Sequence, residues 1–270
     1  MTAVLRPPLA ITSAEVVSVV DLTPRMRRIT LGGPGLDGFA GDHPADAIKL
    51  LLPPGGVGAP PAASWGADGL TLADPAAEFE LRTYTVRRFA AGLLDVDAVL
   101  HGHGPGTSWA RSAAVGDPVT FLGPRRDFPD DLAESAPDLL LVVGDETAIP
   151  AAAGIAEALP EGGRAVFLLE VDDAADELAL TSRGTLSVTW LHRGGGQSLA
   201  DAVRAVALPP GRTRAWVAAE SGVAVHLRRV LRRELGLGRG DVTAFGYWQR
   251  DRVADDIDAD DMDDVPEEPS

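Results

Sequence analysis

The chain has 270 residues, of which 45% are hydrophobic and 24% are charged, a composition typical of a soluble globular protein with room for two domains. It has no cysteine, which excludes disulfides, thiol nucleophiles and cysteine-ligated zinc or iron–sulfur sites. The formal net charge of −16 argues against nucleic-acid binding, which needs basic surface. If the protein moves electrons, a non-covalent organic cofactor therefore carries them.

Residues 1–8 lack the basic and apolar regions of a secretory signal, and no apolar run approaches the ~18 residues of a membrane span. We therefore expect a cytoplasmic protein that does not insert into a membrane. We also expect it to be a monomer. From Ala254 to Ser270 there are nine acidic residues and no basic one, so residues 253–270 are predicted to form a disordered acidic tail. The tail either only solubilises the protein or serves as a docking segment.

Short β-type segments follow one another through the first half of the chain. Six of them have about the length of a strand and are bounded by Gly, Pro or Asp: residues 15–23, 26–33, 47–53, 78–89, 92–102 and 117–123. Because few helical stretches separate them, they predict an antiparallel β-barrel domain over residues 10–125. Residues 53–72, rich in Pro, Gly and Ala, are predicted to form a loop.

The second half alternates between strands and helices. Apolar runs predict buried parallel strands at residues 138–144, 164–171, 186–192, 214–220 and 242–248. Helical segments are predicted at residues 145–159, 198–207 and 221–235. The alternation predicts an α/β nucleotide-binding domain with a parallel sheet over residues 136–252, after a boundary within 123–138. A β-barrel followed by such a domain is the ferredoxin reductase-like arrangement.

The predicted strand at 78–89 contains the first group of candidate binding residues. Arg82 and Tyr84 are expected on one face of the strand and Thr85 on the other. Arginine suits a pyrophosphate, tyrosine offers a flat face and a hydroxyl, and threonine offers hydrogen bonds to a flavin edge. A solvated edge strand with an ordinary aromatic residue explains the same pattern.

The segment "HGHGPGTSWARSA" places a glycine-rich turn directly before a short helix. Thr107 or Ser108 is the predicted N-cap, and the free amides of the helix start then form an anion site for a diphosphate. His101 and His103 are alternatively a metal pair, although no further His or Cys cluster supports that interpretation.

Four segments, "RTYTVR", "DVDAVLHGHGPGTSWARSAAVGDPVTFLGPR", "LLLVVGDETAIPAAAGIAEALP" and "GYWQR", occur in the order and spacing of one family. Across residues 13–252 the chain resembles the siderophore-interacting proteins, which are flavoproteins. The resemblance implies an FAD site, with ferric siderophore as the substrate. It assigns these cofactor-binding residues: Arg82, Tyr84, Thr85, Arg87, Asp97, His101, Gly106, Thr107, Ser108, Trp109 and Ala110.

The first strand-to-helix turn of the α/β domain lacks the G-x-G-x-x-G dinucleotide pattern. Asp145 and Glu146 place carboxylates where a pyrophosphate is expected, yet the resemblance favours a nicotinamide site around Asp145 and Thr147. Near the end of the domain, Tyr247 and Trp248 are predicted either to cover the flavin or only to end the last strand.

The electron donor stays open between NADH, NADPH and ferredoxin. Glu170 and Asp172 follow the pattern of carboxylates that bind a ribose and discourage a 2′-phosphate, whereas Arg193 has the opposite preference. Ala219 stands where the family pattern has glycine, and its methyl group is expected to crowd a nucleotide.

Many ferric siderophores are anionic, so the substrate site is expected to be basic. The candidates are Lys49, Arg125, Arg126 and Arg250. Lys49 is alternatively on the wet face of its strand, and the two neighbouring arginines alternatively pair with Asp127 and Asp130. The predicted function is FAD-dependent reduction of the ferric siderophore to release Fe(II). The alternatives are a flavin reductase-like enzyme with another acceptor and a non-catalytic ligand-binding protein.

Overall fold

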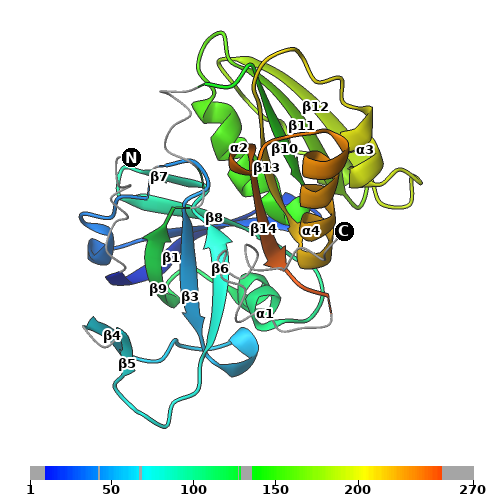
Figure 1. Cartoon of the computed structure of the whole chain (residues 1–270). Helices are drawn as coiled ribbons and strands as arrows, with labels where there is room; N and C mark the ends of the chain where they lie inside the picture. The colour runs from blue at the N-terminus through cyan, green and yellow to red at the C-terminus, as the bar shows by residue number, and fades with distance from the viewer. Residues whose placement is uncertain (1–9, 42, 67–68, 127, 129–135, 251–270) are drawn as a thin grey trace. The chain divides into compact units, whose positions relative to one another are not determined.

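The computed structural model describes residues 10–41, 43–66, 69–126, 128 and 136–250 (Figure 1). The chain divides into two compact units, Met1–Asp130 with Ala153–Ile155, and Asp131–Ala152 with Ala156–Ser270. The predicted acidic tail lies outside the described residues. Within the described ranges, no helix combines the length and apolar character that a membrane crossing requires.

The first unit contains a seven-stranded antiparallel sheet with the strand order β6-β3-β9-β1-β2-β8-β7. Its strands are β1 (Ala10–Thr23), β2 (Met26–Gly32), β3 (Ala47–Leu52), β6 (Glu80–Thr85), β7 (Arg88–Ala90), β8 (Leu93–Val99) and β9 (Pro118–Arg125). β6 also contacts β8, so the sheet curls back on itself. The antiparallel β-type first domain is therefore confirmed.

Alternating side chains explain why these segments form strands. On β8, Leu94, Val96 and Ala98 are buried in the core of the unit, together with Ile29 of β2 opposite Val96. Other core side chains come from β1, β3, β9 and from α1 (Pro105–Ser112). One face of the sheet therefore builds a single apolar core, and the helix α1 covers part of it.

Two details differ from the sequence-based prediction. The predicted loop at 53–72 contains a 3-10 turn (Pro54–Gly56) and a hairpin of β4 (Ala63–Gly66) and β5 (Gly69–Leu72), in which Trp65 pairs with Leu70. The predicted strand at 78–89 is split into β6 and β7, because β6 pairs with β3 while β7 pairs with β8.

The second unit contains a five-stranded parallel sheet with the order β12-β11-β10-β13-β14, which confirms the predicted α/β domain. Its strands are β10 (Leu139–Gly144), β11 (Arg164–Val171), β12 (Thr185–His192), β13 (Thr213–Glu220) and β14 (Val242–Trp248). The helices are α2 (Ile149–Ala158), α3 (Leu199–Ala205) and α4 (Ser221–Arg229), and a π-helix (Val230–Glu234) continues α4. Side chains of α3 and α4 share one core with β10 and β13. A 3-10 turn, Glu146–Ala148, joins β10 to α2.

Candidate functional site

The N-terminus of α1 is the strongest candidate anion site in the first unit. The helix begins after Gly104, with Pro105 in its first turn and no side-chain hydrogen bond at its cap. Its first helical hydrogen bond runs from the Ser108 amide to the Gly104 carbonyl, 2.9 Å away. The amides of Gly106 and Thr107 therefore precede the helical ladder, and they favour a negatively charged ligand.

The predicted N-cap, Thr107 or Ser108, is wrong. Pro105 has a φ suited to a first helical position and needs no amide partner, so the N-cap is Gly104, three residues before Thr107. The Thr107 hydroxyl instead donates to the His101 carbonyl at 2.6 Å. This bond ties the glycine-rich turn to the first turn of the helix.

Gly106 brings the helix start against the strand β6. A Cβ atom added to Gly106 would lie 2.6 Å from the Tyr84 hydroxyl oxygen and 3.5 Å from the Arg82 Cγ. A Cβ atom on Gly56 would similarly lie 1.9 Å from the Pro105 carbonyl oxygen. The backbone of the helix start is thus approached closely from two sides, and only glycine fits at these contacts.

Arg82 and Tyr84 lie on the same face of β6, as the sequence predicts. Their cross-strand partners on β3 are the core residues Leu50 and Ile48. The Tyr84 ring packs 5.5 Å from the Trp109 ring, and burial raises the pKa of the Tyr84 hydroxyl, so this group stays protonated and able to donate. The Arg82 guanidinium is oriented by a 2.6 Å ion pair with Glu80.

The remaining predicted residues of α1 have different environments. Trp109 and Ala110 belong to the apolar core, so their side chains pack the helix against the sheet. Ser108 is half-buried and His103 is exposed. The residues that the structure gathers at the helix start are therefore Arg82, Tyr84, His101, Gly106 and Thr107, which fit the diphosphate of a dinucleotide.

Asp97 is the buried member of an ion pair that the sequence did not reveal. Its two carboxylate oxygens accept from the Arg28 guanidinium at 2.6 and 2.8 Å, and the Arg87 Nε lies 4.0 Å from it. Arg28 is directly opposite Asp97 in the β2–β8 register. The ion pair stabilises the β2–β8 pairing. That Asp97 or Arg87 contacts a flavin stays a prediction.

Two of the predicted substrate residues lie close together on the sheet. Arg125 and Thr85 are both paired with Ala47, from opposite sides, and Lys49 lies two residues further along β3, opposite Thr83. Lys49 alternates with the core residues of its strand, so it is on the opposite face from that core. Lys49 is half-buried there, and its neighbours on that face, Ala47 and Leu51, are buried, so this is not a simple solvated face.

Arg126 lies near a different acid from those predicted. Its Nε is 3.6 Å from the carboxylate of Asp46, which is only 1% exposed. Asp127 and Asp130 are outside the described residues. The buried carboxylate of Asp46, just before β3, therefore partly balances the positive charge of Arg126.

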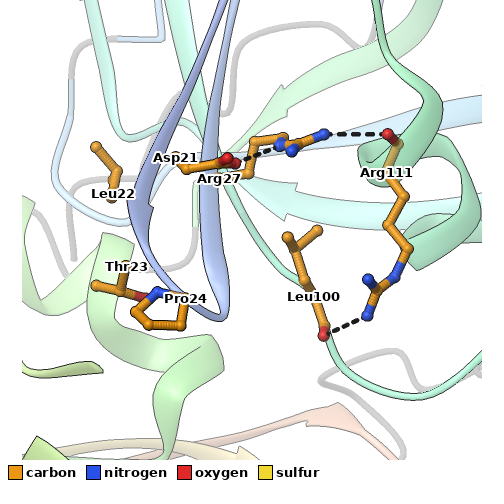
Figure 2. A pocket seen from close by; sticks show the side chains of 7 residues that line it. All are labelled: Asp21, Leu22, Thr23, Pro24, Arg27, Leu100 and Arg111. Atoms are coloured by element: carbon orange, nitrogen blue, oxygen red, sulfur yellow. Dashed lines mark hydrogen bonds and ion pairs between the residues drawn. The ribbon is translucent and has the colours of Figure 1, made fainter. Parts of the chain in front are cut away.

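A hollow of about 440 Å³ lies at the β1–β2 turn. Its lining, shown in Figure 2, consists of Asp21, Leu22, Thr23, Pro24, Arg27, Leu100 and Arg111. Arg27 donates to the carbonyls of Ala110 and Arg111, and Arg111 donates to the Leu100 carbonyl. These cations stabilise the C-terminal end of α1, and no predicted site residue lines the hollow.

Asp145 occupies the carboxyl end of β10 in the second unit and is 4% exposed. One carboxylate oxygen accepts from the Thr147 amide at 2.9 Å and from the Thr147 hydroxyl at 2.5 Å. The other accepts from the Glu220 amide at 2.9 Å and from the Trp248 indole at 2.8 Å. Burial, reinforced by the charge of Glu146, raises the pKa of this carboxyl, against the effect of its hydrogen bonds.

Next to Asp145, three carboxylates surround Arg193. The guanidinium donates to Glu146, to Glu170 at 2.8 Å and to Asp172 at 3.0 Å. Burial raises the pKa of the Glu170 carboxyl, while Arg193 acts in the opposite direction. Sequence patterns suggested these residues one at a time, but not that they form one cluster.

The end of β14 also belongs to this edge of the second unit. The Tyr247 ring packs 6.1 Å from Trp216, whereas the Trp248 indole turns to Asp145. The Arg250 amide donates to Glu220 at 3.3 Å. Ala219 is fully buried in β13, opposite Gly246. Among the described residues, no three His, Asp or Glu side chains form a candidate metal site.

Comparisons with known proteins identify both halves of the chain. A family model for the siderophore-interacting FAD-binding domain matches residues 15–128, and one for siderophore-interacting proteins matches residues 137–251. The ferric vibriobactin reductase ViuB of Vibrio cholerae is 34% identical over 233 residues, 83% of each chain.

Solved structures agree with these matches. A siderophore utilization protein from T. fusca is 37% identical, with a TM-score of 0.80 over 93% of this chain and 97% of that chain. The siderophore-interacting protein SipS from Aeromonas hydrophila is 28% identical, with a TM-score of 0.73 over 90% of this chain and 100% of that chain. Ferredoxin reductases at 13% and 17% identity share the fold alone, which confirms the ferredoxin reductase-like arrangement. The FAD-binding domain supports FAD as the cofactor.

Replacing Gly106 by Ala is expected to weaken FAD binding by about tenfold, or roughly 1.4 kcal/mol, because the new methyl group displaces the Tyr84 hydroxyl from the helix start. Fluorescence titration of the apoprotein with FAD measures this. Gly104→Ala is the matched control, since nothing lies within 4 Å of its added Cβ and its φ is −73°. Equal affinities of the two variants would contradict the assignment of this site.

Asp145→Asn is expected to lower the free energy of unfolding of the second unit by about 2–4 kcal/mol. The amide nitrogen cannot accept a hydrogen bond, so donors now satisfied by one carboxylate oxygen are left buried without a partner. Urea denaturation followed by tryptophan fluorescence measures the change. Asp241→Asn, which only alters a surface pair with Arg212, should stay within about 1 kcal/mol of the parent.

Proposed function

Because this chain belongs to the siderophore-interacting protein family, we propose that it is an FAD-dependent reductase that converts ferric siderophores to Fe(II). The observation that carries the proposal is the uncapped start of α1, held against Arg82 and Tyr84 by the close approach of Gly106. The relationship to ferric vibriobactin reductase supports the same reaction.

In this proposal the first unit binds and orients the cofactor. The amides of Gly106 and Thr107 and the Arg82 guanidinium hold the diphosphate, and the Tyr84 hydroxyl donates to the sugar chain. The further residues proposed to line the cofactor are Thr85, Arg87, Asp97, His101, Ser108, Trp109 and Ala110. Trp109 and Ala110 contribute through the helix backbone, since their side chains are in the core.

FAD, when bound, can accept two electrons from a donor and pass them one at a time to an acceptor. The ferric ion is the substrate, and one electron converts its Fe(III) to Fe(II). Hard oxygen ligands hold Fe(II) more weakly, so the metal leaves the chelate. No side chain has to transfer a proton, and the residues of this chain act by positioning and by charge.

The proposed substrate residues are Lys49, Arg125, Arg126 and Arg250. Lys49 and Arg125 belong to adjacent cross-strand rows of the sheet that also contain Thr83 and Thr85. This arrangement places two cations beside a residue proposed to contact the cofactor, where they favour an anionic chelate. Arg126 contributes less, because Asp46 balances its charge.

A nicotinamide nucleotide is the proposed electron donor, bound at the carboxyl end of the parallel sheet near Asp145, Thr147, Tyr247 and Trp248. Ligands of open parallel sheets bind at this end. Because the Thr147 amide already donates to Asp145, we do not expect this amide to bind the nucleotide diphosphate. Ferredoxin is the competing donor.

Anaerobic absorbance spectroscopy of the FAD-loaded protein tests the function. We expect a reduced nicotinamide to bleach the oxidised-flavin band and a ferric siderophore to restore it, with Fe(II) captured by a chelator. If only reduced ferredoxin bleaches the band, the protein is still a reductase, but its electron donor is ferredoxin rather than a nicotinamide nucleotide. A reduced protein that leaves the ferric siderophore unchanged but reduces a quinone would overturn the proposed substrate.

Lys49→Gln is expected to raise KM for an anionic ferric siderophore by about five- to tenfold, the loss of roughly 1 kcal/mol of charge attraction. The rate with a neutral quinone as the acceptor should not change. Arg164→Gln, which removes an exposed cation at the start of β11, is the control. If both variants keep the parent KM, Lys49 is only part of a solvated strand face.

A further inference from the structure

The ends of β11 and β12 bring together residues that lie 23 positions apart in the chain. Arg193 directly follows β12, and its amide donates to the Val171 carbonyl at 2.9 Å. Glu170 is the penultimate residue of β11 and Asp172 follows the strand. The side chains of Glu170, Asp172 and Arg193 therefore meet at the carboxyl end of two neighbouring strands.

Every nitrogen of the Arg193 guanidinium is engaged by a carboxylate. The Nε donates to Glu170 at 2.8 Å, one terminal nitrogen donates to Asp172 at 3.0 Å and to Glu146 at 2.8 Å, and the other donates to Glu146. Three ionised carboxylates around one guanidinium leave this cluster with about two negative charges. The arginine is therefore shielded from a further anion.

The position of the cluster matters because of how nucleotides bind to parallel sheets. A carboxylate at the end of the second strand accepts a hydrogen bond from the adenosine 2′-hydroxyl of NAD, whereas a nearby cation accommodates the 2′-phosphate of NADP. β11 is the strand that follows the first βα turn, and its neighbours in the sheet are β10 and β12. A 2′-phosphate at this position would face Glu170 and Asp172, and the arginine that would attract it already has three acidic partners.

We propose that the Glu146–Glu170–Asp172–Arg193 cluster selects a donor without a 2′-phosphate, so that the enzyme uses NADH in preference to NADPH. Glu170 is the acceptor for the ribose hydroxyl, and Arg193 positions its carboxylate. The inference rests on the proposed nicotinamide-dependent function and narrows its donor. It also decides between the opposite preferences that Glu170 and Arg193 suggest when each is considered alone.

Calorimetric binding of two fragments tests the selection without any turnover. We expect the FAD-loaded protein to bind 5′-AMP at least tenfold more tightly than adenosine 2′,5′-bisphosphate. Flavin bleaching should give a ratio of kcat/KM for NADH over NADPH of at least ten. Tighter binding of the bisphosphate, or a preference for NADPH, would overturn the proposal.

The double variant Glu170→Gln, Asp172→Asn removes two negative charges and leaves Glu146 as the only acidic partner of Arg193 within the cluster. We expect its NADH-over-NADPH ratio to fall at least tenfold and its affinity for the bisphosphate to rise. Glu177→Gln is the matched control, because Glu177 is an acid that pairs with His192 rather than with Arg193. If the NADH-over-NADPH ratio of the double variant is unchanged, the cluster does not cause the selectivity, even if the parent enzyme prefers NADH.

The outcomes separate this inference from the function on which it rests. If neither fragment binds while dithionite-reduced protein still reduces the ferric siderophore, the donor inference fails and the reductase stands. If 5′-AMP binds selectively but the reduced protein leaves the siderophore unchanged, the selectivity stands and the proposed substrate fails.

Discussion

The Asp145 carboxylate is the interaction on which the second unit depends most. It ends β10 and accepts hydrogen bonds from the start of the next 3-10 turn, from the end of β13 and from the end of β14. A buried carboxylate is stable only when such donors replace its lost water, so the three segments are fixed relative to one another. Gly144 just before it has no room for a side chain, since a Cβ atom would lie 2.5 Å from the Ala218 carbonyl oxygen.

The two units use the same property of helix termini in opposite ways. In the first unit the start of α1 has no side-chain cap, and glycines at 106 and 56 allow close backbone contacts there. In the second unit the turn after β10 is capped by the protein's own carboxylate, Asp145. An anion is therefore favoured at the first helix start, while the second site must recognise its ligand through other groups.

Local charge matters more than the net charge of −16 in this protein. At physiological ionic strength charges are screened over about 8 Å, so a ligand responds mainly to the groups beside it. In the first unit, the cations Lys49 and Arg125 belong to adjacent cross-strand rows of the sheet, although the whole chain is acidic. In the second unit, by contrast, carboxylates surround the cation Arg193.

The sequence by itself determined the order of strands and helices, the two kinds of sheet and the shared face of Arg82 and Tyr84, because these depend on the local alternation of side chains. Composition excluded cysteine chemistry in the same way. Only the tertiary structure decided the partners of Asp145, which are 75 and 103 residues away, and those of Asp97 and Arg193. Such partners depend on which strands become neighbours and in which register they pair, and no local pattern contains that information. The start of α1 at Gly104 was missed for a smaller reason, since Pro105 could begin a helix without the side-chain cap that the pattern led us to expect.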